Sequence, residues 1–317
     1  MSLTNATSVT GTIHSKSGPP PYRVESIVDL AGVAFMLKAG DPRLEDIHLG
    51  GPSPTPQMDN LEGMVRAWDN HPEWLDFLDP SAPNHADKLL ERDLYAHHWK
   101  RWLPDSGRVM DLGGGVGRFT TWLLKKGLDV EHVDPDLRSI WRALQHCVNL
   151  HHTNIERLGR VDFHWTTGER LPELPAVDAV IAAEVLCYVE EPKTVLQQIK
   201  RVLKPGGLLL ASVEARWGWA SSLDVAPDTL KALLSNGVVH VPGDRWINTY
   251  SEENLRELFC DWEILYLMPT HYIPSGPYEA VAGELNLIEV IDLEAQLRAR
   301  PATTHQNRAW MLVARPR

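Results

Sequence analysis

Three glycines stand at alternate positions directly after an acidic residue, and this spacing predicts a loop that holds a ligand. The acid is Asp111, near the end of a short apolar run, and the glycines are Gly113, Gly115 and Gly117. Glycine lets the backbone turn sharply and approach a ligand where any Cβ would intrude. A strand, a glycine loop and a helix in this order place the ligand at the carboxyl edge of a parallel sheet.

The dinucleotide fingerprint G-x-G-x-x-G is absent from this loop. Counted from Gly113, its third glycine would fall on Arg118, and counted from Gly115 it would fall on Thr120. A pyrophosphate would also be repelled by the neighbouring carboxylate of Asp111. The acid suits a ligand with a cationic amino-acid end, so an NAD-dependent oxidoreductase is the less favoured alternative.

Two more acidic residues follow predicted strands. Asp134 comes after the stretch Asp129–Val133 and precedes Pro135, which is typical of a helix N-cap with proline in the first turn. Glu184 follows the apolar stretch Val177–Ala183. Because parallel strands end at one edge of their sheet, we expect both acids to lie in the same ligand cleft as the glycine loop.

Several side chains outside the predicted core could accept a proton from a substrate. His271 is favoured because it lies just after the predicted strand Trp262–Met268. Tyr188 and Glu25 are the next candidates, the first just beyond a predicted strand and the second near the start of the chain. The remaining candidates are Tyr272, His240, His305, Tyr22 and Glu214. No metal site is expected, because the cysteines form no C-x-x-C and the adjacent histidine pairs face apart on helices.

Composition limits the classes of function. The chain has 317 residues, of which 43% are hydrophobic and 23% charged, as in a globular protein with a full core. Its net charge of −11 and the lack of a long basic run argue against a nucleic-acid partner. Three widely separated cysteines are typical of reduced intracellular thiols. No apolar run has membrane-spanning length and no secretory signal is evident, so we expect a cytoplasmic location.

Strands and helices alternate through the centre of the chain, which predicts an α/β fold with a parallel sheet and right-handed crossovers. The predicted strands are Arg108–Leu112, Asp129–Val133, Val161–Trp165, Val177–Ala183, Leu208–Val213, Trp262–Met268 and Trp310–Ala314. A helix over Leu89–Leu103 is expected to lead into the sheet. Another is expected to begin at Pro192 and to be stopped by the segment Lys204-Pro205-Gly206-Gly207.

Three segments are expected along the chain. Residues 1–20 are rich in Ser, Thr, Gly and Pro and predict a flexible tail, and residues 21–86 predict a helical N-terminal extension that serves as a lid or dimerisation segment. Residues 87–317 are expected to form the core, with insertions at 214–250 and 269–308. A homodimer through the N-terminal segment is a hypothesis.

From Leu89 to Met268, and again in the closing strand, the chain resembles class I S-adenosylmethionine (SAM)-dependent methyltransferases. The pattern D-x-G-x-G-x-G resembles the family's first motif, and Asp134 stands where the family's acid holds both ribose hydroxyls. The stretch Val177–Leu186 is similar to the fourth strand and the edge beyond it, and Leu203–Gly207 to the turn before the fifth. The resemblance implies a Rossmann-like sheet of seven strands, with the last strand antiparallel, and inserted segments that cap the substrate.

The resemblance also implies the cofactor, SAM, and a set of residues that bind it. These are Asp111, Gly113, Gly115, Gly117, Asp134, Pro135, Thr167, Gly168, Glu169 and Glu184. The adenine contacts depart from the family pattern, because Thr167 stands where many relatives have an aspartate. A backbone carbonyl, the threonine hydroxyl or Glu169 would have to serve there.

Methyl transfer is an in-line displacement, so the enzyme mainly aligns the nucleophile, the methyl carbon and sulfur. The chain has 12 tryptophans and 5 phenylalanines, and we expect Trp217, Trp219 and Trp246 to line a pocket for a flat or cationic substrate. The sequence therefore predicts methyl transfer to a small aromatic molecule, a phenol, an aromatic amine or an indole, in a biosynthetic pathway. A non-catalytic SAM-binding partner or regulator is the alternative.

Overall fold

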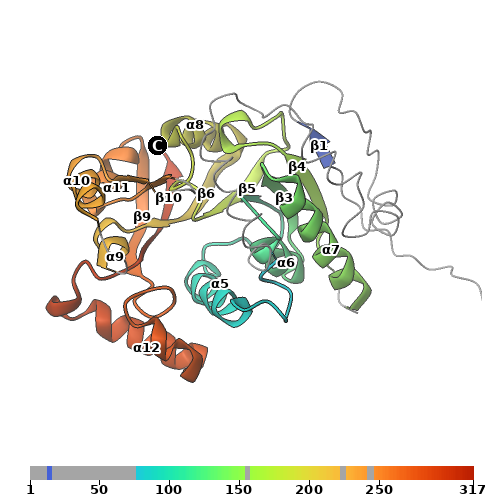
Figure 1. Cartoon of the computed structure of the whole chain (residues 1–317). Coiled ribbons are helices and arrows are strands. Elements are labelled where there is room, and N and C mark those ends of the chain that lie inside the picture. Colours follow the sequence, from blue (N-terminus) through green and yellow to red (C-terminus); the bar gives the residue numbers. More distant parts are fainter. Residues whose placement is uncertain (1–12, 16–75, 154–157, 222–225, 241–245) are drawn as a thin grey trace, which may run out of the picture.

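A central eight-stranded sheet organises the structure, which is a computed structural model that describes residues 13–15, 76–153, 158–221, 226–240 and 246–317. The strand order is β1-β4-β3-β2-β5-β6-β10-β9 (Figure 1). The strands are β1 Ile13–Ser15, β2 Arg108–Leu112, β3 Asp129–Asp134, β4 Val161–Trp165, β5 Val177–Ala183, β6 Leu203–Glu214, β9 Trp262–Thr270 and β10 Ala309–Pro316. All seven predicted strands are present. The additional strand β1 falls in the segment predicted as a tail and pairs in parallel with β4.

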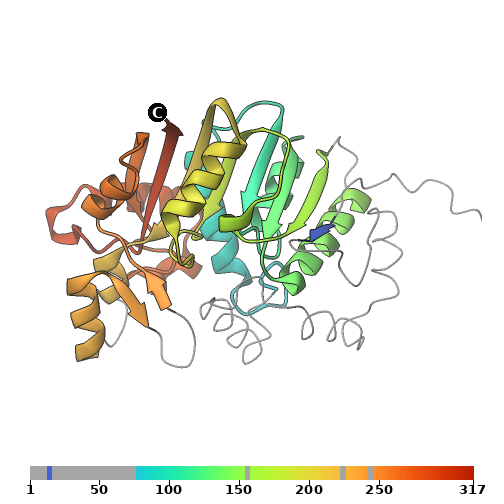
Figure 2. The same cartoon turned by 90° about the horizontal axis from the view of Figure 1, so that it is seen from above.

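The last strand runs against its neighbours, as predicted. β10 pairs antiparallel with β6 on one side and with β9 on the other. In Figure 2 it runs toward the labelled C-terminus. Because β10 is antiparallel to β6, its first residue, Ala309, lies opposite the last residue of β6, Glu214. β6 is itself parallel to β5. The start of β10 is therefore at the same edge of the sheet as the ends of the parallel strands.

Helices cover both faces of the sheet, so the core has two layers. The helices α5 (His85–Trp99), α6 (Arg118–Lys125) and α7 (Leu137–Thr153) lie on one face (Figure 1). The helices α8 (Pro192–Val202) and α11 (Glu252–Leu258) lie on the other. Neighbouring strand residues point to opposite faces, and each packs in a different layer of the core.

Two local predictions about helix ends were wrong. Asp136, and not Asp134, caps α7, because its carboxylate accepts hydrogen bonds from the backbone N–H and the hydroxyl of Ser139, both at 2.8 Å. The segment Lys204–Gly207 does not stop α8, which already ends at Val202. It forms a bulge inside β6, where the pairing with β5 jumps from Leu203 to Leu208.

The two predicted insertions both contain secondary structure. The first holds α9 (Arg216–Ser221), α10 (Pro227–Ser235) and a separate hairpin of β7 (Val238–His240) and β8 (Trp246–Asn248). The second, which we call the cap, joins β9 to β10 and holds the turn η2 (Glu279–Glu284), α12 (Leu287–Arg298) and the turn η3 (Pro301–Thr303).

The cap packs on α5 through a small core of its own. Ile273, Ala282 and Val290 are buried together, and Leu90 of α5 packs against them. Of the predicted N-terminal extension, residues 21–75 lie outside the described part of the chain. Among the helices that are described, none combines the length and the apolarity needed to cross a membrane.

Candidate active site

The glycine loop follows β2 and leads into α6. Gly113, Gly115 and Gly117 all have positive φ angles, of 65°, 54° and 90°. A Cβ added at Gly115 would meet no heavy atom within 4 Å, whereas one added at Gly117 would lie 3.1 Å from the Cβ of Ala143 in α7. Gly117 therefore allows two helices to pack closely, and Gly115 leaves a backbone turn open toward free space.

Asp134 lies at the end of β3, next to the glycine loop. Its two carboxylate oxygens accept hydrogen bonds from the backbone N–H groups of Gly115 and Asp136, each at 2.8 Å. Burial raises the pKa of Asp134 to about 7, and repulsion from Asp136 adds to the shift. Since its neighbours supply only neutral donors, the buried carboxylate has no counter-charge and can still accept further hydrogen bonds.

Asp111 lies beneath the loop and is 2% exposed. Its carboxylate accepts a hydrogen bond from the hydroxyl of Thr120 at 2.6 Å, and that hydroxyl lies 2.8 Å from Nδ1 of His132. Burial raises the pKa of Asp111 to about 6. In this structure Asp111 braces the loop against α6, and its predicted contact with a cationic ligand stays a prediction.

The segment at the end of β4 and directly after it is hydrogen-bonded to Asp134 and Pro135. The backbone N–H of Thr166 donates to the carbonyl of Asp134 at 3.1 Å, and the indole N–H of Trp165 donates to the carbonyl of Pro135 at 2.9 Å. The next residues, Thr167 and Gly168, are buried. A Cβ at Gly168 would lie 3.0 Å from Cγ1 of Val195, so the absence of a side chain there allows α8 to pack.

Glu169 is the residue of this segment with unused polar atoms. Both of its carboxylate oxygens are shielded from solvent and have no hydrogen-bond partner among the described residues. A shielded acceptor without a donor is costly unless a ligand supplies one. The predicted roles of Thr167, Gly168 and Glu169 in adenine binding remain predictions.

A second half of the site lies beyond β5 and β9. Glu184, directly after β5, and His271, directly after β9, have φ angles of 59° and 62°, a region that residues with side chains rarely adopt. Tyr95 of α5 bridges them, because its hydroxyl donates to Glu184 at 3.3 Å and its ring lies 4.5 Å from that of His271. Strained backbone of this kind clusters at functional sites, so both residues are candidates for a role in binding or chemistry.

The imidazole of His271 is 1% exposed, and its Nε2 has no hydrogen-bond partner among the described residues. Burial lowers its pKa to about 4, although the nearby carboxylates Glu91 and Glu184 act in the opposite direction. The ring is therefore neutral at neutral pH. Glu25 lies outside the described residues, so only His271 and Tyr188 of the three favoured proton acceptors can be placed.

A buried group of charges, which the sequence analysis missed, joins the two halves. The guanidinium of Arg118, the first residue of α6, donates to Glu91 of α5 at 2.9 Å, and the Lys88 ammonium lies 2.8 Å from the same carboxylate. Ser275 of the cap donates to the other oxygen of Glu91. Burial alone would raise the pKa of Glu91, but Lys88 and Arg118 together hold it well below its usual range.

Tyr188 and Glu214 lie at the ends of β5 and β6. The hydroxyl of Tyr188 donates to Glu214 at 3.5 Å, and Arg308 forms an ion pair with the other oxygen of that carboxylate. Burial raises the pKa of Glu214 to about 7, Arg308 opposes the shift, and Glu184 adds to it. The structure therefore groups Tyr188 with Glu214 rather than directly with His271.

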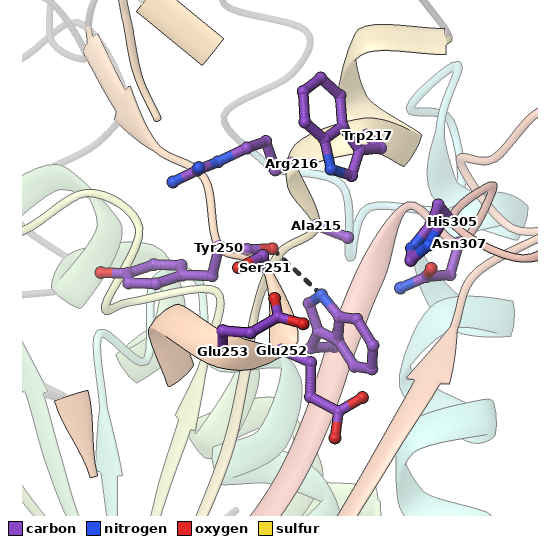
Figure 3. Close-up of a pocket in the computed structure, with 10 residues that line it drawn as sticks. Ala215, Arg216, Trp217, Tyr250, Ser251, Glu252, Glu253, His305 and Asn307 are labelled. Carbon is purple, nitrogen blue, oxygen red and sulfur yellow. Dashed lines mark hydrogen bonds between the residues drawn. The ribbon is translucent and has the colours of Figure 1, made fainter. Parts of the chain in front are cut away.

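A pocket of about 70 Å³ opens beyond the end of β6 (Figure 3). It is lined by Ala215, Arg216, Trp217, Tyr250, Ser251, Glu252, Glu253, His305, Asn307 and Trp310. Trp217 is 36% exposed, and the indole N–H of Trp310 donates to the carbonyl of Tyr250 at 3.1 Å. Of the three tryptophans predicted to line a pocket, Trp217 does so, and the side chains of Trp219 and Trp246 lie outside the described part of the chain.

Comparisons with known proteins match the central part of the chain. A methyltransferase domain family matches residues 85–261. An uncharacterized methyltransferase of Mycobacterium bovis is 37% identical over 123 residues, which cover 37% of this chain and 44% of that protein. A ubiquinone biosynthesis O-methyltransferase of a Bradyrhizobium species is 30% identical over 171 residues, covering 44% of this chain and 64% of the relative. The chain thus spans less than two thirds of the length of either relative.

Solved structures share the fold. The magnesium protoporphyrin IX methyltransferase of Synechocystis, crystallised with bound SAH, superposes with a TM-score of 0.51 at 15% identity, over 79% of this chain and 96% of that chain. The family match covers more than half of the chain, and the antiparallel last strand and the glycine loop agree with it. The chain belongs to the class I SAM-dependent methyltransferases, a family whose cofactor is SAM.

Proposed function

We propose that this protein transfers the methyl group of SAM to a small aromatic acceptor in a biosynthetic pathway. The observation that carries the proposal is the open backbone turn at Gly115 beside the buried carboxylate of Asp134. Family membership supports methyl transfer, and the name of the Bradyrhizobium relative, an O-methyltransferase of ubiquinone biosynthesis, supports a biosynthetic acceptor.

The donor set of the site fits SAM. Asp134 offers carboxylate oxygens to a pair of ribose hydroxyls, the Gly115 turn lets the ligand contact the backbone, and Glu169 offers two shielded acceptors to an adenine amino group. Glu184 directly precedes Val185, whose side chain lies against Gly113 of the loop, so its charge favours a cationic ligand there. Bound SAM supplies an electrophilic methyl group and takes both electrons of the broken carbon–sulfur bond.

His271 is proposed to take the proton of the acceptor. Its neutral imidazole has an Nε2 without a partner among the described residues, and the ring packs at a tilt of 31° against the ring of Tyr95. A pKa of about 4 makes His271 a weak base at rest. A base of this strength is sufficient, because the hydroxyl or amine proton of the acceptor becomes strongly acidic as the acceptor's oxygen or nitrogen bonds to the methyl carbon. Tyr188 and Glu25 remain the alternative candidates.

Aromatic side chains support a flat acceptor. Trp217 and Trp310 contribute aromatic rings to the pocket beyond β6 (Figure 3), whereas the ring of Tyr250 points into the core and its hydroxyl donates to the carbonyl of Leu186. The pocket lies at the sheet edge that also carries the glycine loop. Aromatic walls favour aromatic and cationic groups. The pocket's volume of about 70 Å³ is several times what one water requires, so it suits a substituent or ring edge of a larger molecule.

Calorimetry with SAM and with NAD tests the cofactor, and a lack of heat with SAM would refute the proposal. A screen with radiolabelled SAM against small phenols, aromatic amines and indoles then tests the acceptor class, with Asp134→Ala as the background control. SAM binding without transfer to any acceptor would favour a non-catalytic SAM-binding protein. His271→Asn should lower transfer about 100-fold or more while leaving SAM affinity unchanged if the assignment of the base is right.

A further inference from the structure

Glu294 is a fully buried acid in the cap that no binding or catalytic role yet explains. It lies on α12 with 0% exposure, and one carboxylate oxygen accepts hydrogen bonds from the backbone N–H groups of Tyr272 and Ile273, at 2.7 and 2.9 Å. The other oxygen lies 3.5 Å from the hydroxyl of Thr270. A single side chain thus contacts the residues on both sides of His271.

These contacts fix the backbone around the proposed base. His271 has a φ of 62°, a conformation that costs energy in a residue with a side chain and persists only where the surroundings enforce it. Backbone N–H groups that point at a buried carboxylate form strong hydrogen bonds. Burial raises the pKa of Glu294 above its usual range, and the backbone N–H groups and Arg298 reduce this shift without reversing it.

The direction of each hydrogen bond follows from the chemistry of the groups. An ionised carboxylate only accepts, so the Thr270 hydroxyl donates its one proton to Glu294. The same hydroxyl lies 3.3 Å from Nδ1 of His271 and must then accept from Nδ1–H. A neutral imidazole carries one proton, so Nε2 is left with its lone pair free. The charged groups that surround the ring are Glu91, Glu184, Lys88 and Arg118.

We infer that Glu294 is a positioning residue that acts through Thr270 to hold His271 in the tautomer whose Nε2 accepts a proton. The inference rests on the proposed role of His271 and deepens it, because it explains how a buried neutral histidine keeps Nε2 unprotonated and able to accept a proton. A carboxylate in the cap, 23 residues beyond the histidine it serves, sets the direction of a short chain of hydrogen bonds.

Glu294→Gln separates this role from simple packing. The amide oxygen of glutamine can still accept from Tyr272 and Ile273, but its NH₂ group donates to Thr270. The hydroxyl must then donate to Nδ1 of His271, and the ring proton moves to Nε2. The variant should therefore keep the fold and reverse the tautomer. Thr270→Val, which has the same shape without the hydroxyl, should leave the tautomer mixed.

Nitrogen NMR of the full-length protein labelled in its histidine rings measures the tautomer directly. His271→Asn identifies the signals of this ring among the 14 histidines. We expect Nδ1–H in the wild type and Nε2–H in Glu294→Gln. Asp292→Asn is the matched control, because it removes one exposed negative charge from the same helix and should change nothing.

A wild-type ring protonated on Nε2, or an unchanged tautomer in Glu294→Gln, would overturn the inference. If Glu294→Gln does not fold, Thr270→Val decides, and a wild-type tautomer in that variant would also overturn it. With an acceptor found by the screen, kcat of Glu294→Gln should fall about 100-fold while the Kd for SAM changes less than about twofold. Calorimetry with SAM is independent of the tautomer, so failure of the proposed function is distinguishable from failure of the relay.

Discussion

The buried carboxylates of the glycine-loop side and of the contact between α5 and α6 are stabilised in opposite ways. On the glycine-loop side, Asp111 and Asp134 are buried among neutral donors, and burial raises the pKa of each, to about 6 and about 7. At the contact between α5 and α6, which joins this side to the cap, Glu91 is just as buried but has Lys88 and Arg118 against it, and its pKa is lowered. A carboxylate without a counter-charge is prepared for a ligand, whereas a neutralised one holds structural elements together.

If Glu91 holds the two halves together, its loss should be the largest effect. Glu91→Ala leaves the buried charge of Arg118 and the half-buried charge of Lys88 without this carboxylate, so the free energy of unfolding should fall by about 3–5 kcal/mol. Denaturant unfolding measures it. Glu263→Ala removes the exposed pair with Arg315 and should cost at most about 1 kcal/mol. Equal losses in the two variants would mean that Glu91 contributes no more to stability than an exposed ion pair does, and that it does not hold the two halves together.

On the glycine-loop side the largest effect should be on binding. Asp134→Ala removes both acceptors from the ribose position, so calorimetry should show SAM affinity reduced about 100-fold or more. Asp136→Ala is the control, because it removes the N-cap of α7 at a cost of about 1 kcal/mol in stability. Its affinity for SAM should stay within about twofold, and an unchanged affinity in Asp134→Ala would refute the ribose assignment.

Two glycines of one loop should respond differently to the same substitution. The methyl group added by Gly115→Ala meets no other atom of the protein, so the loss of stability should be limited to the backbone strain of a positive φ, about 1–2 kcal/mol. The same methyl group would occupy space that the ligand needs, so SAM affinity should fall about tenfold. Gly117→Ala adds a contact with Ala143 to the strain and should lose more stability. Thermal unfolding with and without SAM separates these effects. A larger loss of SAM affinity in Gly117→Ala would reverse the assignment.

The smallest predicted effect is a pH dependence. The folded pKa of Asp134, about 7, lies above its ordinary value, so the folded state binds more protons, and this group's contribution to stability falls as pH rises from about 4 to 7. Ribose hydroxyls favour the ionised form, so SAM affinity should rise about fivefold between pH 6 and 7, following the ionised fraction. Calorimetry across this range should show a flatter profile for Asp134→Asn, and an equally steep one would assign the titration elsewhere.

The two halves also differ in how much of each could be predicted from the sequence. Residues 108–134 form a contiguous strand, loop, helix and strand, so local spacing was enough to predict the loop, the position of Asp134 and the order of the elements. The antiparallel last strand followed from the family resemblance. Helix ends depend on single caps, which is why Asp134 was mistaken for the cap that Asp136 provides.

The cap half was largely unpredictable because its contacts join distant parts of the chain. Glu91, Arg118 and Ser275 meet only after α5, α6 and the cap have packed, and nothing in their sequence spacing indicates that contact. The one feature of the sequence that could have indicated this group of charges was the position of Arg118, directly after Gly117 of the glycine loop. His271 was found because it follows a strand, but Glu294 has no local pattern that links it to that histidine.

The connection from β9 to β10 has a consequence for how this protein could diversify. Thr270 and Ala309 are paired neighbours in the sheet, so the whole cap leaves and re-enters the sheet at adjacent points. Two strands that lie about 4.8 Å apart can be joined by segments of very different length without disturbing the pairing that holds them. The length and sequence of the cap can therefore change during evolution while the pairing of β9 with β10, and the glycine-loop half of the site, stay as they are.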